Sequence, residues 1–109
     1  MSGQARRILE DPANERLVSV ASLWEIAIKI SLARLPVYGL TVARVEEQLR
    51  KQSFIQIPVR LDALIRVEQL PWIHRDPFDR LLIAQALAED IPLLTSDGQI
   101  QRYPVKTIW

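Results

Sequence analysis

The sequence predicts an α/β domain with a short, largely parallel sheet. Short apolar segments with the character of strands alternate along the chain with helical segments of about ten to fifteen residues, which is the order typical of this class. The chain has 109 residues, and 49% of them are hydrophobic. That length gives one compact domain over residues 1–109 with a real core, and it is too short for two such domains.

In the first half of the chain, the pattern predicts three helices and one strand. An amphipathic segment at 2–9 predicts a short helix, and the mostly apolar residues 16–20 predict a strand. The segment 22–35 predicts a strong helix that stops before Pro36, and 41–52 predicts another helix with a polar face.

The second half repeats the pattern. We expect a strand at 54–59, a helix at 61–70, a helix at 77–90, a strand at 91–96, a turn with a short helix at 97–103, and a strand at 105–109. Pro77 fits the first turn of its helix, where its missing N–H has no intrahelical partner to lose.

Composition excludes several classes of site and partner. Fourteen basic and thirteen acidic side chains leave a net charge of +1, so no strong overall field points to a nucleic acid or a membrane. The chain has no cysteine, which removes disulfides, thiolate nucleophiles and cysteine metal sites. No apolar run approaches the roughly 18 residues needed to span a bilayer, and the first 20 residues do not follow the charged, apolar and small-residue order of an export signal. We therefore expect a cytoplasmic protein.

Three acidic residues are expected at one edge of the sheet. Glu25 and Asp79 lie in the first turns of predicted helices, and Asp97 directly follows a predicted strand. In parallel α/β units the helix N-termini and the carboxyl ends of the strands share an edge, where such folds bind ligands. Asp79 also lies on a helix face that is otherwise apolar, so its carboxylate needs a partner.

Each acid also has a purely structural interpretation. Ser22 and Glu25 form an S-x-x-E capping box, and Asp76, which precedes a proline, is a good helix N-cap. Asp79 would gain from the helix dipole, and Asp97 with the following glycine is an ordinary turn pair.

The combination of acids favours a metal site. Carboxylates that share one edge repel each other, although Lys29 lies four residues after Glu25 and could pair with it. A divalent cation removes the repulsion. Oxygen ligands without a set of histidines or cysteines suit Mg²⁺ or Mn²⁺ better than zinc.

Two blocks of the sequence carry a family resemblance. The segments "SVASLWEIAIK" and "HRDPFDRLLIAQALAEDIPLLTSD", with a V-x-x-x-W end, resemble the PIN-domain family and within it the VapC-type toxins of bacterial toxin–antitoxin pairs. The resemblance runs from Leu17 to Trp109. It implies a three-layer α/β/α fold with a short, mainly parallel sheet. It also implies an endoribonuclease that uses Mg²⁺ or Mn²⁺, forms a homodimer and is neutralised by a VapB-like protein antitoxin.

The resemblance also assigns residues. It makes Glu25, Asp79 and Asp97 the catalytic and metal-binding acids of this chain. Thr95 and Ser96, beside the last acid, are expected to support it by hydrogen bonds.

Further candidates come from the sequence around the second block. Asp76 is expected to act first as a helix cap and second as a site residue. His74, Arg75 and Arg80 flank the acids and are candidates for contacts to RNA phosphates, with simple solvation as the alternative. Trp24 and Trp72 could stack on bases, but we expect them to pack in the core.

One departure from the family pattern concerns the start of the chain. Family members begin with an apolar strand that ends in an aspartate, whereas residues 1–9 resemble the second helix of the family. We therefore expect the first strand and helix, with the first metal-binding aspartate, to be missing.

A shortened or misassigned start, a degenerate gene, or a sheet completed by another chain would each account for this departure. We favour the first. The alternative function is a non-catalytic PIN-like protein that binds an antitoxin or itself.

Overall fold

A computed structural model describes residues 2–35 and 37–109, and in that part it shows six helices and four strands. The chain divides into two compact units. Unit 1 comprises Met1–Asn14 and Val59–Trp109, and unit 2 comprises Glu15–Pro58. Each unit contains one two-stranded parallel sheet with helices around it, which confirms the predicted α/β class. That the whole chain acts as a single domain stays a prediction.

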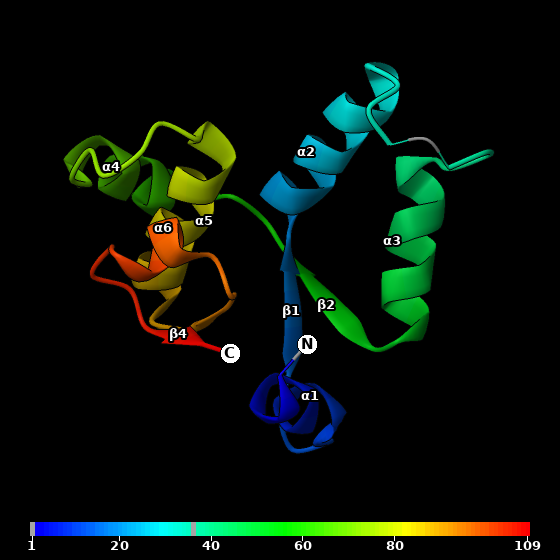
Figure 1. The fold of residues 1–109 in the computed structure, drawn as a ribbon, viewed down its shortest axis with the longest axis horizontal. Helices are drawn as coiled ribbons and strands as arrows, with labels where there is room; N and C mark the ends of the chain where they lie inside the picture. Colours follow the sequence, from blue (N-terminus) through cyan, green and yellow to red (C-terminus); the bar gives the residue numbers. More distant parts are fainter. Residues whose placement is uncertain (1, 36) are drawn as a thin grey trace. The chain divides into compact units, whose positions relative to one another are not determined.

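Unit 2 is a parallel pair of strands with two helices. Strand β1 (Arg16–Ser19) pairs with β2 (Phe54–Ile57), in a register that places Arg16 opposite Phe54 and Ser19 opposite Ile57. Strand β1 leads directly into α2 (Val20–Ser31), as Figure 1 shows, and α3 (Val42–Lys51) precedes β2. Helix α3 contacts both α2 and β2.

Helix α2 begins earlier than the sequence predicts. The Ser19 hydroxyl accepts a hydrogen bond from the backbone N–H of Ala21 at 3.0 Å, so Ser19 is the N-cap. Ser22 is then the third helical residue, and Glu25 lies in the second turn. The predicted capping box of Ser22 and Glu25 is therefore wrong, because the helix begins upstream of Ser22 and Ser19 already caps it through the N–H of Ala21.

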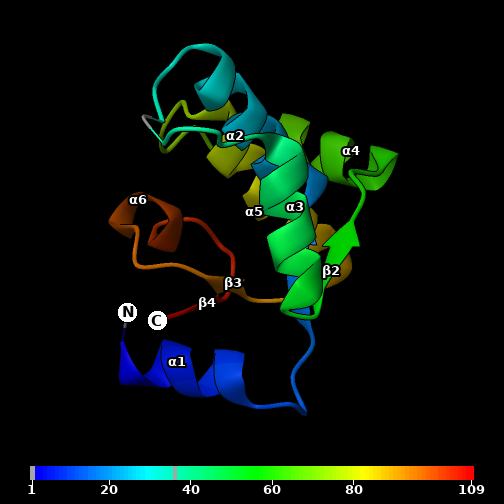
Figure 2. The same ribbon diagram turned by 90° about the vertical axis from the view of Figure 1, so that its right-hand side faces the viewer.

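Unit 1 holds the remaining elements. These are α1 (Gly3–Glu10), α4 (Leu61–Gln69), α5 (Pro77–Glu89), β3 (Leu93–Leu94), α6 (Gly98–Gln101) and β4 (Thr107–Ile108). Helices α4 and α5 pack against each other (Figure 1), and β3 pairs in parallel with β4 (Figure 2). The buried core of this unit consists of Leu70, Ile83, Ala84, Ile100 and Tyr103.

Both ends of helix α5 are fixed by local contacts. The Asp76 carboxylate accepts hydrogen bonds from the backbone N–H groups of Phe78 and Asp79, at 2.9 and 3.0 Å, and Pro77 takes the first helical position. This confirms Asp76 as the N-cap. The helix ends at Asp90, whose left-handed conformation (φ 53°) closes the last turn.

A buried arginine ties α5 to the end of α4. Arg80 is only 3% exposed. Its guanidinium donates to the carbonyl of Pro71 at 2.7 Å and to the carbonyls of Val67 and Leu70 at 3.4 Å each. These carbonyls lie at and just beyond the C-terminus of α4, where the helix dipole is negative, so they stabilise the cation.

Aromatic side chains complete the surroundings of Arg80. Its guanidinium carbon lies 3.9 Å from the centre of the Trp72 ring, and Tyr103 accepts a hydrogen bond from Nη1 at 3.0 Å. The prediction that Trp24 and Trp72 pack in the core is wrong, because they are 56% and 77% exposed. One face of Trp72 covers a cation, which does not require burial of the whole ring.

The residues described contain no helix with the length and apolar character that a membrane crossing requires.

The Arg80 contacts predict that substitutions of two nearby arginines, Arg80 and Arg75, change the free energy of unfolding by very different amounts. We expect Arg80→Met to lower the free energy of unfolding by roughly 3 kcal/mol, because it leaves buried carbonyls without donors. Arg75→Met, at an exposed position, should change it by less than about 0.5 kcal/mol. Urea unfolding followed by circular dichroism measures both, and equal stability of the two variants would contradict the role of Arg80.

Candidate functional site

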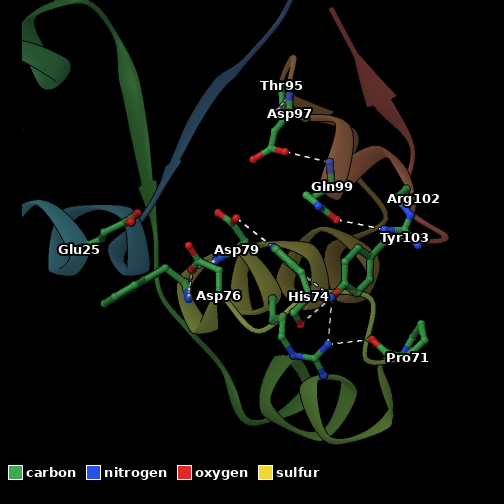
Figure 3. Close-up of polar contacts among 12 residues, drawn as sticks. Glu25, Pro71, His74, Asp76, Asp79, Thr95, Asp97, Gln99, Arg102 and Tyr103 are labelled. Carbon is green, nitrogen blue, oxygen red and sulfur yellow. Dashed lines mark hydrogen bonds and ion pairs between the residues drawn. The ribbon is translucent and has the colours of Figure 1, made fainter.

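Two of the three predicted acids belong to the same unit. Asp79 lies in the first turn of α5, and Asp97 is the N-cap of α6. Figure 3 shows both carboxylates pointing into the same region of unit 1. Glu25, the third predicted acid, lies in α2 of unit 2.

Glu25 has a local partner. Its Oε2 lies 3.4 Å from Nζ of Lys29, one helical turn later. This confirms the pairing that the spacing of the two residues suggested. The charge of Glu25 is therefore partly balanced within α2 itself.

Asp97 is held through one carboxylate oxygen and through its own backbone. Oδ1 accepts from the N–H of Gln99 at 2.8 Å, and the Asp97 N–H donates to Oγ1 of Thr95 at 3.0 Å. Thr95 thus supports the loop that carries Asp97, as expected. Ser96 is exposed, and in the described part of the chain no hydrogen bond of its side chain is found.

Asp79 has the partner that its position on an apolar helix requires. Its Oδ2 lies 3.1 Å from Nε2 of His74, and its side chain is 21% exposed. Figure 3 shows the histidine beside the carboxylate. The structure thus gives His74 a role in supporting Asp79, and a contact of His74 with RNA stays a prediction.

Tyr103 is the residue of this site that the sequence pattern did not reveal. Its hydroxyl lies 2.7 Å from Nδ1 of His74 and 3.0 Å from Nη1 of Arg80, and it accepts from the backbone N–H of His74 at 3.1 Å. Tyr103 and His74 are 29 positions apart. No helical or strand periodicity links residues at that distance, so only the folded unit brings them together.

The hydrogen bonds of this group shift two pKa values. Contacts to Tyr103 and then to the Asp79 carboxylate raise the pKa of His74, and they outweigh its partial burial. Burial alone would raise the pKa of Tyr103, but hydrogen bonds from His74 and Arg80 outweigh it, so the pKa of Tyr103 is lowered.

The predicted RNA contacts have different surroundings. Arg75 is exposed, so its side chain is accessible to solvent and to a phosphate. Arg80 is buried and donates to four protein acceptors. The ring nitrogens of His74 both have protein partners. Of these three residues, Arg75 is the one whose charged group is accessible to a ligand.

The acids suit magnesium bound together with a substrate. Among residues 2–35 and 37–109, no three histidine, aspartate or glutamate side chains come together as a group that could hold an ion. Mg²⁺, however, is usually bound by one or two carboxylates plus substrate phosphates, and it keeps several waters. Asp79 and Asp97 therefore fit the ligand chemistry of such an ion and do not form a closed protein cage.

Comparison with known families gives one match. The model of the PIN domain matches residues 2–106, which is nearly the whole chain. No curated protein matches significantly, and no solved structure does.

The capping role of Asp76 predicts how substitutions there behave. We expect Asp76→Ala to lower the free energy of unfolding by about 1 kcal/mol, because two N–H groups lose their acceptor. Asp76→Asn should keep most of the stability, since its amide oxygen still caps. Chemical denaturation of both variants measures this, and a loss in Asp76→Asn as large as in Asp76→Ala would contradict a simple cap.

His74 predicts how stability depends on pH. Because its pKa is raised in the folded state, the folded chain holds the proton more tightly than the unfolded chain. The resulting stabilisation is complete below the unfolded pKa of about 6.5 and is lost as the pH rises through the folded pKa.

Urea unfolding between about pH 6 and about pH 8 tests this linkage. We expect the stability of the wild type to fall relative to that of His74→Gln over this range. The amino terminus titrates in both proteins and cancels in the difference. Parallel curves for the two proteins would show that His74 does not contribute.

Proposed function

The chain belongs to the PIN domain family, and we propose that it is a metal-dependent endoribonuclease, the toxin of a VapC-type toxin–antitoxin pair. Members of this family are generally nucleases and typically use divalent metals. The observation that carries the proposal is the placement of Asp79 and Asp97. Both lie at helix N-termini of unit 1 with their carboxylates directed to one region.

The contacts of these two acids support a role in binding an ion. Asp79 uses Oδ2 for His74, and Asp97 uses Oδ1 for the N–H of Gln99. In the part of the chain that the structure describes, no hydrogen bond or ion pair engages the other oxygen of either carboxylate. Each acid is thus oriented through one oxygen and offers the second to a ligand.

Asp79 and Asp97 would hold Mg²⁺ or Mn²⁺ together with a phosphate of the RNA. The bound ion would supply an activated water and stabilise charge on the phosphoryl group during in-line displacement. We assign Glu25 to the same reaction on the family resemblance alone. Thr95 holds the Asp97 loop, and exposed Arg75 would contact the RNA backbone.

We further propose the partners that this class implies. They are an RNA substrate, a VapB-like protein antitoxin and a second copy of the chain. A cytoplasmic location likewise stays a prediction.

A second candidate function is a non-catalytic binding protein that engages an antitoxin or itself. Helix α4 favours it, because Leu61, Leu64 and Ile65 are exposed apolar side chains at neighbouring helical positions. Adjacent exposed apolar side chains are a common feature of protein–protein contacts.

Cleavage of a single-stranded RNA with Mn²⁺ separates the two functions. We expect cleavage by the wild type to stop with EDTA. Asp79→Asn should reduce the rate by more than the roughly 10- to 100-fold loss typical of removing an outer-shell partner of a metal. Asp97→Asn should behave alike. Glu89→Gln, an exposed acid at the other end of α5, is the matched control and should keep the wild-type rate.

Either of two results would contradict the nuclease. Cleavage that survives both EDTA and Asp79→Asn would point to a contaminating enzyme or to another site. A folded wild type that cleaves no RNA, and that binds a protein partner equally well as Asp79→Asn, would support the binding protein.

A further inference from the structure

The hydroxyl of Tyr103 lies at the centre of a buried polar group in unit 1. Tyr103 is 4% exposed and Arg80 is 3% exposed, so water does not compete for their contacts. Four polar groups lie within hydrogen-bonding distance of the phenol oxygen. They are Nη1 of Arg80 at 3.0 Å, the backbone N–H of His74 at 3.1 Å, Nδ1 of His74 at 2.7 Å and the carbonyl of His74 at 3.3 Å.

Counting donors and acceptors constrains the direction of these bonds when the ring of His74 is neutral. A phenol hydroxyl has one hydrogen to donate and two lone pairs that accept. The guanidinium of Arg80 and the backbone N–H of His74 can only donate, so together they occupy both lone pairs. The Tyr103 O–H must therefore donate, and of its two acceptors Nδ1 of His74 at 2.7 Å is nearer than the carbonyl of His74 at 3.3 Å. When the ring is protonated, Nδ1–H donates to the phenol oxygen instead and the O–H is left to that carbonyl, which is the state that the raised pKa of His74 reflects.

The position of the proton on His74 follows. Nδ1 accepts from Tyr103 and so carries no hydrogen in the neutral ring, which places the hydrogen on Nε2. Nε2 lies 3.1 Å from Oδ2 of Asp79, so the ring donates to that carboxylate. Figure 3 shows this series of contacts from Tyr103 through His74 to Asp79.

We propose that Tyr103 is a positioning residue that holds neutral His74 as the Nε2–H tautomer and so directs an N–H donor at Oδ2 of Asp79. The contact between Arg80 and Tyr103 does not change with pH in the neutral range, because an arginine stays protonated. Its guanidinium is fixed in turn by the carbonyls of Pro71 and of α4. The orientation of the phenol is thus set by a guanidinium that keeps its charge across the neutral pH range and is held in place by backbone carbonyls.

The consequence for Asp79 rests on the proposed function. With Oδ2 bound to His74, the carboxylate cannot rotate freely, and Oδ1 is the oxygen available to a ligand. Had the ring taken the Nδ1–H tautomer, a lone pair of Nε2 would face the carboxylate and repel it. Tyr103 therefore prevents the arrangement in which the histidine would push Asp79 out of position.

Imidazole ¹⁵N NMR of the wild type tests the tautomer directly. His74 is the only histidine of the chain, so the ring signals need no assignment by mutation. At a pH where titration shows the ring to be neutral, we expect Nε2 to carry the hydrogen and Nδ1 to show the shift of an unprotonated nitrogen. A hydrogen on Nδ1, or an even mixture of tautomers, would overturn the proposal.

Two variants show which neighbour sets the tautomer. In Asp79→Ala the ring should keep the hydrogen on Nε2, because Tyr103 still donates to Nδ1. A change to a mixture would mean that Asp79, and not Tyr103, fixes the ring. In Tyr103→Phe the Nδ1 resonance should move to higher frequency as it loses its donor, whereas Tyr38→Phe, at the fully exposed tyrosine, should leave it unchanged. An unmoved resonance in Tyr103→Phe would also overturn the proposal.

RNA cleavage by the same variants separates this inference from the proposed function. If the wild type shows the Nε2–H tautomer but cleaves no RNA, the tautomer assignment holds and the nuclease fails. If the wild type cleaves RNA and Tyr103→Phe lowers its kcat while Tyr38→Phe does not, the result supports both the positioning role of Tyr103 and the nuclease function. Cleavage by the wild type with a hydrogen on Nδ1 would overturn the role of Tyr103 and leave the nuclease intact.

Discussion

The buried cation of Arg80 is the interaction on which unit 1 depends. In the described part of this unit no carboxylate pairs with it, so dipoles must replace the water that it has lost. Carbonyls at and just beyond the end of α4, the hydroxyl of Tyr103 and the face of Trp72 supply that compensation. Because one guanidinium satisfies several acceptors, α4, α5 and the loop between them are held in one arrangement.

That arrangement extends to the candidate site through two side chains. Tyr103 accepts from Arg80 and contacts His74, and His74 in turn contacts Asp79. A carboxylate that binds an ion benefits from such support, since its affinity depends on neighbours that orient it. Asp97 is oriented more simply, by the helix that it caps. Helix capping and ion binding are therefore compatible roles for one carboxylate, because each uses a different oxygen.

The sequence was most informative where neighbours along the chain determine the structure. Asp76 and Pro77 begin α5 where the pattern predicts, and Glu25 pairs with Lys29 because they are one turn apart. The prediction from sequence was wrong where two nearby residues could each cap the same helix. Ser19 and Ser22 are both acceptable N-caps, and the chain uses Ser19, where β1 ends. The burial of Trp72 was also misjudged, since hydrophobicity does not reveal a cation beneath one face of the ring.

By itself the sequence determined the α/β class, the order of the elements and the carboxylates available for chemistry. These depend on hydrophobic period, capping residues and residue type, all of which act over a few positions. Only the tertiary structure decided which partner each carboxylate has and which oxygen it leaves to a ligand. The contact of Tyr103 with His74 spans 29 positions, and the burial that gives it strength exists only when α4, α5 and the segment after α6 have packed together.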